Sequence, residues 1–119
     1  MHFSAADAPL RAEWMVDRLM SDVKANDDQK SKARAIVDAA TGDLQQVTKQ
    51  HAENHQALLA ILKEPTLDRG KLESLRASSI HNLDEGSKRV STAIGDLAEV
   101  LTPAQRSQLA DTIEKWHRF

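Results

Sequence analysis

Cysteine and tyrosine are absent from the 119-residue chain, and aromatic residues make up only 3 % of it. Without cysteine the chain has neither a disulfide framework nor a thiol nucleophile. The scarcity of aromatic residues disfavours a strand-rich fold, because strands are usually rich in aromatic and β-branched side chains. Four glycines and three prolines leave little material for loops. These absences favour a few long helices.

Long runs of like charge and long apolar runs are missing as well. The formal net charge is -2, with 16 basic and 18 acidic residues spread along the chain. Because no basic stretch is long enough to follow a phosphate backbone, nucleic acid is not expected as a partner. No segment approaches the roughly 18 uncharged residues that a membrane span needs, so no membrane span is expected. Residues 1–9 also lack the apolar core of an intact signal peptide.

Apolar residues recur every three or four positions, which is the spacing of amphipathic helices. This pattern predicts a short first helix from Pro9 to about Lys24. Asn26 can cap a second helix with Gln29 at its third position, so that helix is expected to begin near Asp27. Its pattern lasts about 36 residues, which corresponds to a rod of roughly 50 Å. The stripe expected along it is Ala33, Ile36, Val37, Ala40, Leu44, Val47, His51, His55, Leu58 and Leu62.

Pro65 ends the second helix, because proline disfavours helical backbone before it and has no N–H to donate. Thr66 or Asp68 can cap a third helix of similar length, and two rods joined by so short a loop form an antiparallel hairpin. The stripe expected along the third helix is Leu72, Leu75, Ile80, Leu83, Val90, Ile94, Leu97 and Leu101. Each helix retains further apolar residues that the hairpin cannot bury, which favours self-association into a homodimer.

A capping motif opens a short last helix. Thr102 is expected at the N-cap, Pro103 at the first helical position and Gln105 at the third, where it completes a capping box. The fold class is therefore all-α, a long antiparallel helical hairpin with a short helix at each end. Residues 10–119 are expected to form a single domain after a flexible N-terminal segment of residues 1–9.

The same motif carries a resemblance. The segment from Val100 to Arg106, with Leu101, Thr102, Pro103 and Gln105, resembles the LTxxQ motif of the Spy/CpxP family of periplasmic proteins. That family is similar in its order of helices and usually has a second copy near the start of the long helix. Here the segment from residue 25 to 29 keeps only the glutamine and a capping residue. The resemblance covers about residues 10 to 118.

This resemblance implies a periplasmic envelope-stress protein that forms a cradle-shaped homodimer. Spy-like members bind unfolded or partly folded proteins without ATP and suppress their aggregation. CpxP-like members instead dock on a sensor kinase domain, and a scaffold without either activity is a further alternative. The motif is a capping device, so it supports the fold more strongly than either activity.

Six residues are candidates for client contact. Trp14, Met15 and Met20 make the first helix rich in large adaptable side chains, although core packing is the favoured role for Trp14. Lys30, Arg34 and Lys49 are basic residues that could join a charged client-binding face, and the alternative for each is ordinary surface charge with partners one turn away.

His51 and His55 are four positions apart, so they share one face of a helix at a spacing that lets two imidazoles bind zinc. Polar interruption of the hairpin stripe is the favoured alternative, because no third ligand is obvious in the sequence. No cofactor is otherwise expected. A Gly-rich phosphate loop, an HExxH sequence and a nucleophile elbow are all missing, so catalytic residues are not expected and the chain is not predicted to be an enzyme.

Overall fold

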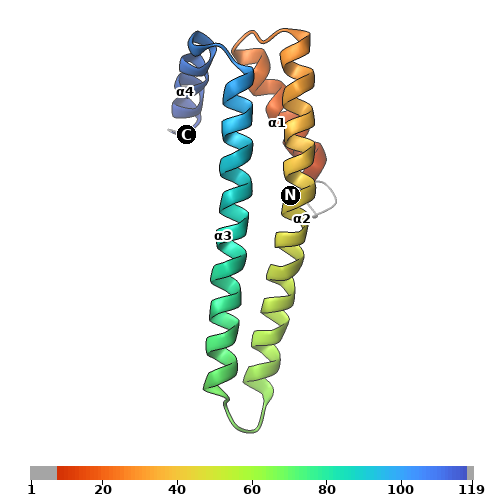
Figure 1. The fold of residues 1–119 in the computed structure, drawn as a ribbon, viewed down its shortest axis with the longest axis vertical. Helices are drawn as coiled ribbons and strands as arrows, with labels where there is room; N and C mark the ends of the chain where they lie inside the picture. The colour runs from red at the N-terminus through yellow and green to blue at the C-terminus, as the bar shows by residue number, and fades with distance from the viewer. Residues whose placement is uncertain (1–7, 118–119) are drawn as a thin grey trace. The chain divides into compact units, whose positions relative to one another are not determined.

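The computed structural model describes residues 8–117, and only the backbone of residues 8–10. The described residues form four helices and no strand: α1 (Ala8–Asp22), α2 (Asp27–Lys63), α3 (Arg69–Val100) and α4 (Pro103–His117) (Figure 1). The all-α class and the order short, long, long, short are confirmed. Within the segment 1–9 that was expected to be flexible, residues 1–7 lie outside the described part, and residues 8–9 belong to α1.

The end of α1 is a left-handed turn that the apolar pattern did not reveal. Lys24 has φ 58°, in the region that favours glycine. The amide of Ala25 donates to the carbonyl of Met20 at 2.9 Å, and the amide of Lys24 donates to the carbonyl of Ser21 at 3.0 Å. These two bonds form a Schellman motif, which satisfies carbonyls at the end of α1 and directs the chain into α2.

The loop between α2 and α3 is short because both of its ends are fixed by sequence. Pro65 lies two residues after the end of α2, where it prevents the helix from continuing. Asp68 Oδ1 accepts the amide of Lys71 at 3.1 Å, at the third position of α3. Of the two caps that the sequence allowed, Asp68 is therefore the one that the chain uses.

The chain divides into two compact units. The four-helix unit consists of residues 1–41 and 91–119, and the hairpin unit consists of residues 42–90, so α2 and α3 contribute to both. In the four-helix unit, α1 contacts α4. Its buried apolar cluster is Val16, Met20, Val23, Ala25, Ala33 and Leu101, with Val37, Leu97 and Leu109 packed against it. Among the described residues, this cluster contains every buried hydrophobic side chain except Ile61.

In the hairpin unit, the end of α2 and the beginning of α3 run antiparallel on either side of the loop (Figure 1). Only three residues of this unit are buried, namely Asn54, Ile61 and Gly86. A Cβ atom on Gly86 would lie 3.2 Å from Val47 Cγ1, so the two helices approach closely at that point. Few side chains of this unit are thus fully buried, and leucines such as Leu58, Leu72 and Leu75 are half-buried.

Polar side chains occupy much of this interface. Asn54 Nδ2 donates to Ser79 Oγ at 3.4 Å, and Ser78 Oγ donates to Asn54 Oδ1 at 3.4 Å. Farther along α3, Asn82 Nδ2 donates to the carbonyl of Val47 at 3.1 Å. Because each of these bonds joins α2 to α3, the bonds fix the register of the hairpin where apolar packing is sparse.

The expected apolar stripes need correction in this region. On α2, His51, His55 and Leu62 are exposed, whereas Asn54 and Ile61 are buried. On α3, the expected inward residues Ile80, Leu83, Val90 and Ile94 are 52, 72, 44 and 62 % exposed. The facing positions of α3 belong instead to small or polar residues such as Asn82 and Gly86, which let the helices approach. The apolar periodicity of α3 therefore marks an outward face as well as an inward one.

Candidate functional site

Two matching capping boxes lie in the four-helix unit, at the start of α2 and at the start of α4. The Asn26 amide donates to Gln29 Oε1 at 2.9 Å, and the Gln29 amide donates to Asn26 Oδ1 at 2.8 Å. At α4, the Thr102 amide donates to Gln105 Oε1 at 2.9 Å, and the Gln105 amide donates to Thr102 Oγ1 at 3.2 Å. The caps predicted at both sites are present in full.

The two capping glutamines also bond to each other. Gln29 Nε2 donates to Gln105 Oε1 at 2.7 Å, and Gln105 Nε2 donates to Gln29 Oε1 at 3.1 Å. Their remaining N–H groups reach the carbonyls of Val100 at 3.1 Å and Val23 at 3.5 Å. We call this arrangement the glutamine clasp. It joins residues 76 positions apart in sequence and so ties the start of α2 to the start of α4.

The residue before each cap supports the clasp from the core side. Ala25 and Leu101 each precede a capping residue, and they are 9 % and 3 % exposed. Pro103 occupies the first position of α4, where its missing N–H has no partner to lose. The segment from residue 25 to 29 is therefore a second copy of the motif in structure, with alanine in place of leucine and asparagine in place of threonine.

Large apolar side chains are exposed on the hairpin unit. Six such residues lie there, and we call them the hairpin apolar residues: Leu59, Leu62, Leu67, Ile80, Leu83 and Val90. Ile80, Leu83 and Val90 are spaced by three and seven positions, so they share one face of α3. Because single exposed apolar residues are ordinary whereas several on one helix face are not, this face of α3 is a candidate interaction surface.

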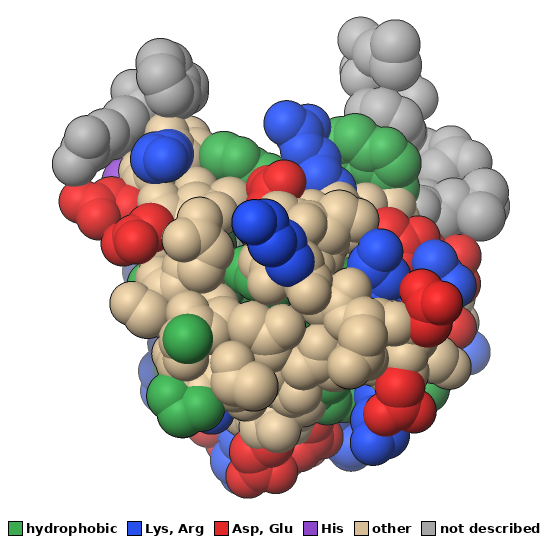
Figure 2. Space-filling view, turned by 90° about the horizontal axis from the view of Figure 1, so that it is seen from above, with side chains coloured by type: hydrophobic (Ala, Val, Ile, Leu, Met, Phe, Trp, Pro, Cys, Tyr) green, Lys and Arg blue, Asp and Glu red, His purple; other side chains and the backbone are tan. Residues whose placement is uncertain are grey.

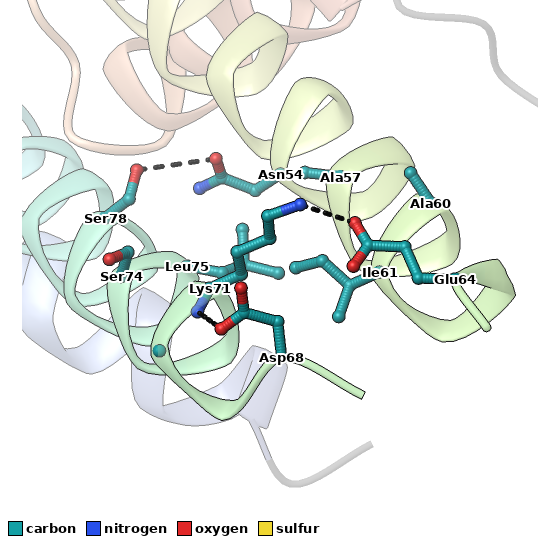
Figure 3. Close-up of a pocket in the computed structure, with 11 residues that line it drawn as sticks. Asn54, Ala57, Ala60, Ile61, Glu64, Asp68, Lys71, Ser74, Leu75 and Ser78 are labelled. Carbon is teal, nitrogen blue, oxygen red and sulfur yellow. Dashed lines mark hydrogen bonds and ion pairs between the residues drawn. The ribbon is translucent and has the colours of Figure 1, made fainter. Parts of the chain in front are cut away.

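A groove of about 790 Å³ opens between α2 and α3 near the loop (Figure 3). Ala57, Ala60, Ile61 and Leu75 give it an apolar lining. The ion pair between Lys71 Nζ and Glu64 Oε1, at 2.7 Å, joins α3 to the residue that follows α2, beside this lining. The hydrogen bond to Glu64 and its negative charge raise the pKa of Lys71, which therefore stays charged. Small side chains leave room in the groove for an apolar group of a partner.

Acidic and basic residues alternate around these apolar positions. In the hairpin unit Lys88 lies 3.2 Å from Asp84, and Arg89 lies 3.4 Å from Asp43. On the face drawn in Figure 2, hydrophobic, basic and acidic side chains are likewise intermixed, and no large area of one sign is present. Such a surface keeps exposed apolar groups in a hydrated, charged setting, which suits weak contacts better than one permanent apolar interface.

Comparison with known proteins identifies the family from the sequence. The profile described as "LTXXQ motif family protein" matches residues 11–112. The chain belongs to the LTXXQ motif family. This is the family of Spy/CpxP-type proteins, so the resemblance inferred from the motif is confirmed. No curated protein matches the chain, and no solved structure matches it.

The matched range includes both capping boxes, so the LTXXQ family assignment and the glutamine clasp concern the same residues. Gln29 was recognised in the sequence as a capping residue, but its bonds to Gln105 were not predicted. The signal for them was available: both glutamines stand third after a capping residue that opens a helix. What sequence spacing could not supply was the distance between the two helix starts.

The candidate residues on α1 lie in different environments. Trp14 is 61 % exposed, so the core position that was favoured for it is wrong, and Met15 is 48 % exposed. Met20 is 2 % exposed and belongs to the core of the four-helix unit. Met20 is therefore not available for client contact in this structure, because it is on the inward side of α1 with Val16.

The three basic candidates lie on α2, and their surroundings differ too. Arg34 Nε donates to Asp17 Oδ1 on α1 at 2.7 Å, and this hydrogen bond with the carboxylate charge raises the pKa of Arg34. Arg34 thus has a role in joining two helices. Lys30 is partly buried in the four-helix unit, whereas Lys49 is exposed on the hairpin unit. Among the three, Lys49 is the one that shares a unit with the hairpin apolar residues.

His51 and His55 are both exposed on α2. Among residues 8–117, no group of three or more histidine or acidic side chains is arranged to hold a metal ion. Zinc binding by the two histidines therefore stays a prediction that would use two protein ligands. The described helices also include none that is long and apolar enough to cross a membrane.

Proposed function

We propose that this chain is an ATP-independent periplasmic chaperone, which binds unfolded or partly folded proteins and suppresses their aggregation. The observation that carries the proposal is the set of hairpin apolar residues, with exposed fractions from 36 % at Leu59 to 72 % at Leu83. Membership of the LTXXQ family, which is consistent with a periplasmic stress protein, supports the same conclusion.

The mechanism is reversible burial of a client's apolar surface. Burying one leucine or isoleucine side chain contributes about 1.5–3 kcal/mol when burial is complete. Exposed positions that are only partly covered contribute less, so several must act together and any one client dissociates readily. The intermixed charges can pair at short range with opposite charges on clients of either sign. No chemical step is needed, so we also propose that the chain is not an enzyme.

A homodimer is part of this proposal. The hairpin unit buries only Asn54, Ile61 and Gly86, and a two-helix hairpin with so small a core gains little from its own packing. A second copy would cover part of the apolar set and stabilise the hairpin. Sedimentation velocity over a range of concentrations would give the stoichiometry directly.

The test is aggregation of several unrelated unfolding proteins, followed by light scattering without ATP. We expect suppression at stoichiometric amounts of the chain. The variant Ile80→Ser/Leu83→Ser should suppress less, because both side chains are more than half exposed and carry little of the folded core. A matched control is Ser87→Ala, which changes an exposed position on the same helix without removing apolar area.

The outcomes separate the alternatives. Failure to suppress aggregation of any client, together with a stoichiometric complex with one sensor domain, would replace the chaperone proposal with a CpxP-like regulatory role. Equal suppression by the double variant and the parent chain would show that the hairpin apolar residues are not the contact surface. The oligomeric state of the double variant must be measured alongside, because the same residues could serve the dimer.

A further inference from the structure

Arg18 lies between two tryptophans in the four-helix unit. Its guanidinium carbon is 5.5 Å from the centroid of the Trp14 ring and 5.3 Å from that of the Trp116 ring. Trp14 and Arg18 are one turn apart on α1, and Trp116 is on α4. Both distances fall within the range of cation–π contact, so the two indoles hold the arginine side chain in one place.

The charge of Arg18 is not neutralised within the part of the chain that the structure describes. Its contacts there are the two indole rings, and no carboxylate or carbonyl oxygen lies within bonding distance. A guanidinium has five N–H donors in one plane and matches a carboxylate with two parallel bonds. Arg34, by contrast, has its carboxylate partner in Asp17. Arg18 is therefore a cation held in place, and its N–H groups have no hydrogen-bond acceptor among the described residues.

Exposed apolar groups border this cation. Trp14 is 61 % exposed, Met15 is 48 % exposed and Ile113 is 50 % exposed. Met15 lies three positions before Arg18 on α1, and Ile113 lies three positions before Trp116 on α4, so each neighbours the cluster on its own helix. The site thus combines one anion-binding group with surrounding apolar area.

We propose that the cluster of Trp14, Arg18 and Trp116 binds a carboxylate of an unfolded polypeptide that stands next to an aromatic or large aliphatic side chain. Arg18 would take the carboxylate, and the apolar neighbour would pack on the exposed indole and Met15. This inference rests on the proposed function and gives it a client class. It is separate from the hairpin apolar residues, which lie in the other unit.

An anionic membrane surface fits the cluster less well than a peptide. Binding to anionic lipid depends on several basic residues, each contributing about 1 kcal/mol. Here α1 and α4 together have five acidic and four basic residues, so Arg18 does not stand in a strongly basic region. One carboxylate can be bound by one arginine, whereas a lipid surface needs many positive charges.

Tryptophan fluorescence can test this proposal without a label. The chain has two tryptophans and no tyrosine, and both tryptophans belong to the cluster. The probe is an acetylated and amidated heptapeptide with one aspartate between a leucine and a phenylalanine. One comparison peptide has asparagine in place of the aspartate, and another has alanine in place of both apolar residues. Calorimetry with the same peptides gives affinities that do not depend on the indoles.

We expect saturable binding of the aspartate peptide, weakened about three- to tenfold in each comparison peptide, the range of a partly exposed ion pair. Arg18→Gln should remove the preference for aspartate over asparagine. Arg69→Gln, which removes an exposed arginine of the hairpin unit, should keep it. Far-UV circular dichroism of both variants checks that they are folded.

Equal affinities for the aspartate and asparagine peptides, or an unchanged preference in Arg18→Gln, would overturn the proposal. Binding to vesicles of anionic phospholipid without binding to the peptides would replace it with a membrane role. Suppression of aggregation by the parent chain without peptide binding would remove this inference and leave the chaperone proposal standing. Peptide binding that depends on Arg18, without suppression of aggregation, would support this inference and remove the chaperone proposal.

Discussion

Removing the glutamine clasp should destabilise the protein by more than the loss of two helix caps. Gln105→Ala deletes the Oε1 that accepts the Thr102 amide and the Gln29 Nε2 group, at 2.9 and 2.7 Å. It also deletes the Nε2 that donates to Gln29 Oε1 at 3.1 Å. Gln29→Ala removes the corresponding groups on the other side. The two substitutions therefore share the same pair of hydrogen bonds.

The expected magnitude follows from these bonds. An intramolecular hydrogen bond contributes about 0.5–1.5 kcal/mol net, and loss of a capping interaction costs about 1 kcal/mol. Each single substitution should lower the free energy of unfolding by about 2–4 kcal/mol. In the double variant the two shared bonds are lost only once, so the sum of the single losses should exceed the double loss by about 1–2 kcal/mol.

Urea unfolding followed by far-UV circular dichroism measures this coupling, at one fixed protein concentration so that any association is held constant. Gln108→Ala is the matched control, because Gln108 lies on α4, as Gln105 does, is exposed, and has no side-chain hydrogen bond among the described residues. It should cost less than about 0.5 kcal/mol. Losses that add within about 0.5 kcal/mol in the double variant would refute the mutual bonding of the two glutamines.

Three further predictions concern α1 and its end. Met20→Ala should lower the free energy of unfolding by about 2–5 kcal/mol, because the Met20 side chain is 2 % exposed. Met15→Ala should lower it by less than about 0.5 kcal/mol, because Met15 is 48 % exposed. Urea unfolding measures both changes. Lys24→Gly should raise the free energy of unfolding by about 1 kcal/mol, seen as a higher melting temperature, because glycine adopts φ 58° without strain. The pKa of Glu13 is raised above its ordinary value by its hydrogen bond to Asp38 and by the charge of that carboxylate. The ionised Glu13 carboxylate therefore destabilises the fold at pH values above its raised pKa, and it has no such effect below the pKa of Glu13 in the unfolded chain. Glu13→Gln should raise the melting temperature near pH 7 and leave it unchanged near pH 4. An equal rise at both pH values would contradict this.

Helix boundaries could be read from the sequence because each is encoded by a few adjacent residues. Asn26 with Gln29 and Thr102 with Gln105 are local signals, and both caps form as expected. The end of α1 is a partial exception. Its turn is left-handed at Lys24, a position at which glycine is the usual sequence signal and is absent here.

Burial was harder to predict, because periodicity shows on which side of a helix a residue lies but not whether another helix covers that side. Trp14 and Met20 both fit the apolar pattern of α1, yet the first is 61 % and the second 2 % exposed. On α3, one apolar series runs inward through Leu75 and another runs outward through Ile80 and Leu83, offset by roughly 100° around the helix. A single-chain pattern cannot rank two such faces. The ion pairs across helices, such as Arg34 with Asp17, were missed for the same reason.

The polar interface of the hairpin unit and its exposed apolar face have the same cause, which is the placement of polar and small residues at inward positions. Asn54, Asn82 and Gly86 occupy inward positions, where they form hydrogen bonds or allow close approach of the helices. The apolar residues one position away, such as Leu83, are thereby turned to solvent. Replacing Asn82 by leucine would give the interface more apolar area, but it would remove a bond that fixes the register with the Val47 carbonyl. The hairpin unit gives up core stability and gains an exposed apolar face on a defined helical framework, which is what a surface for transient partners requires.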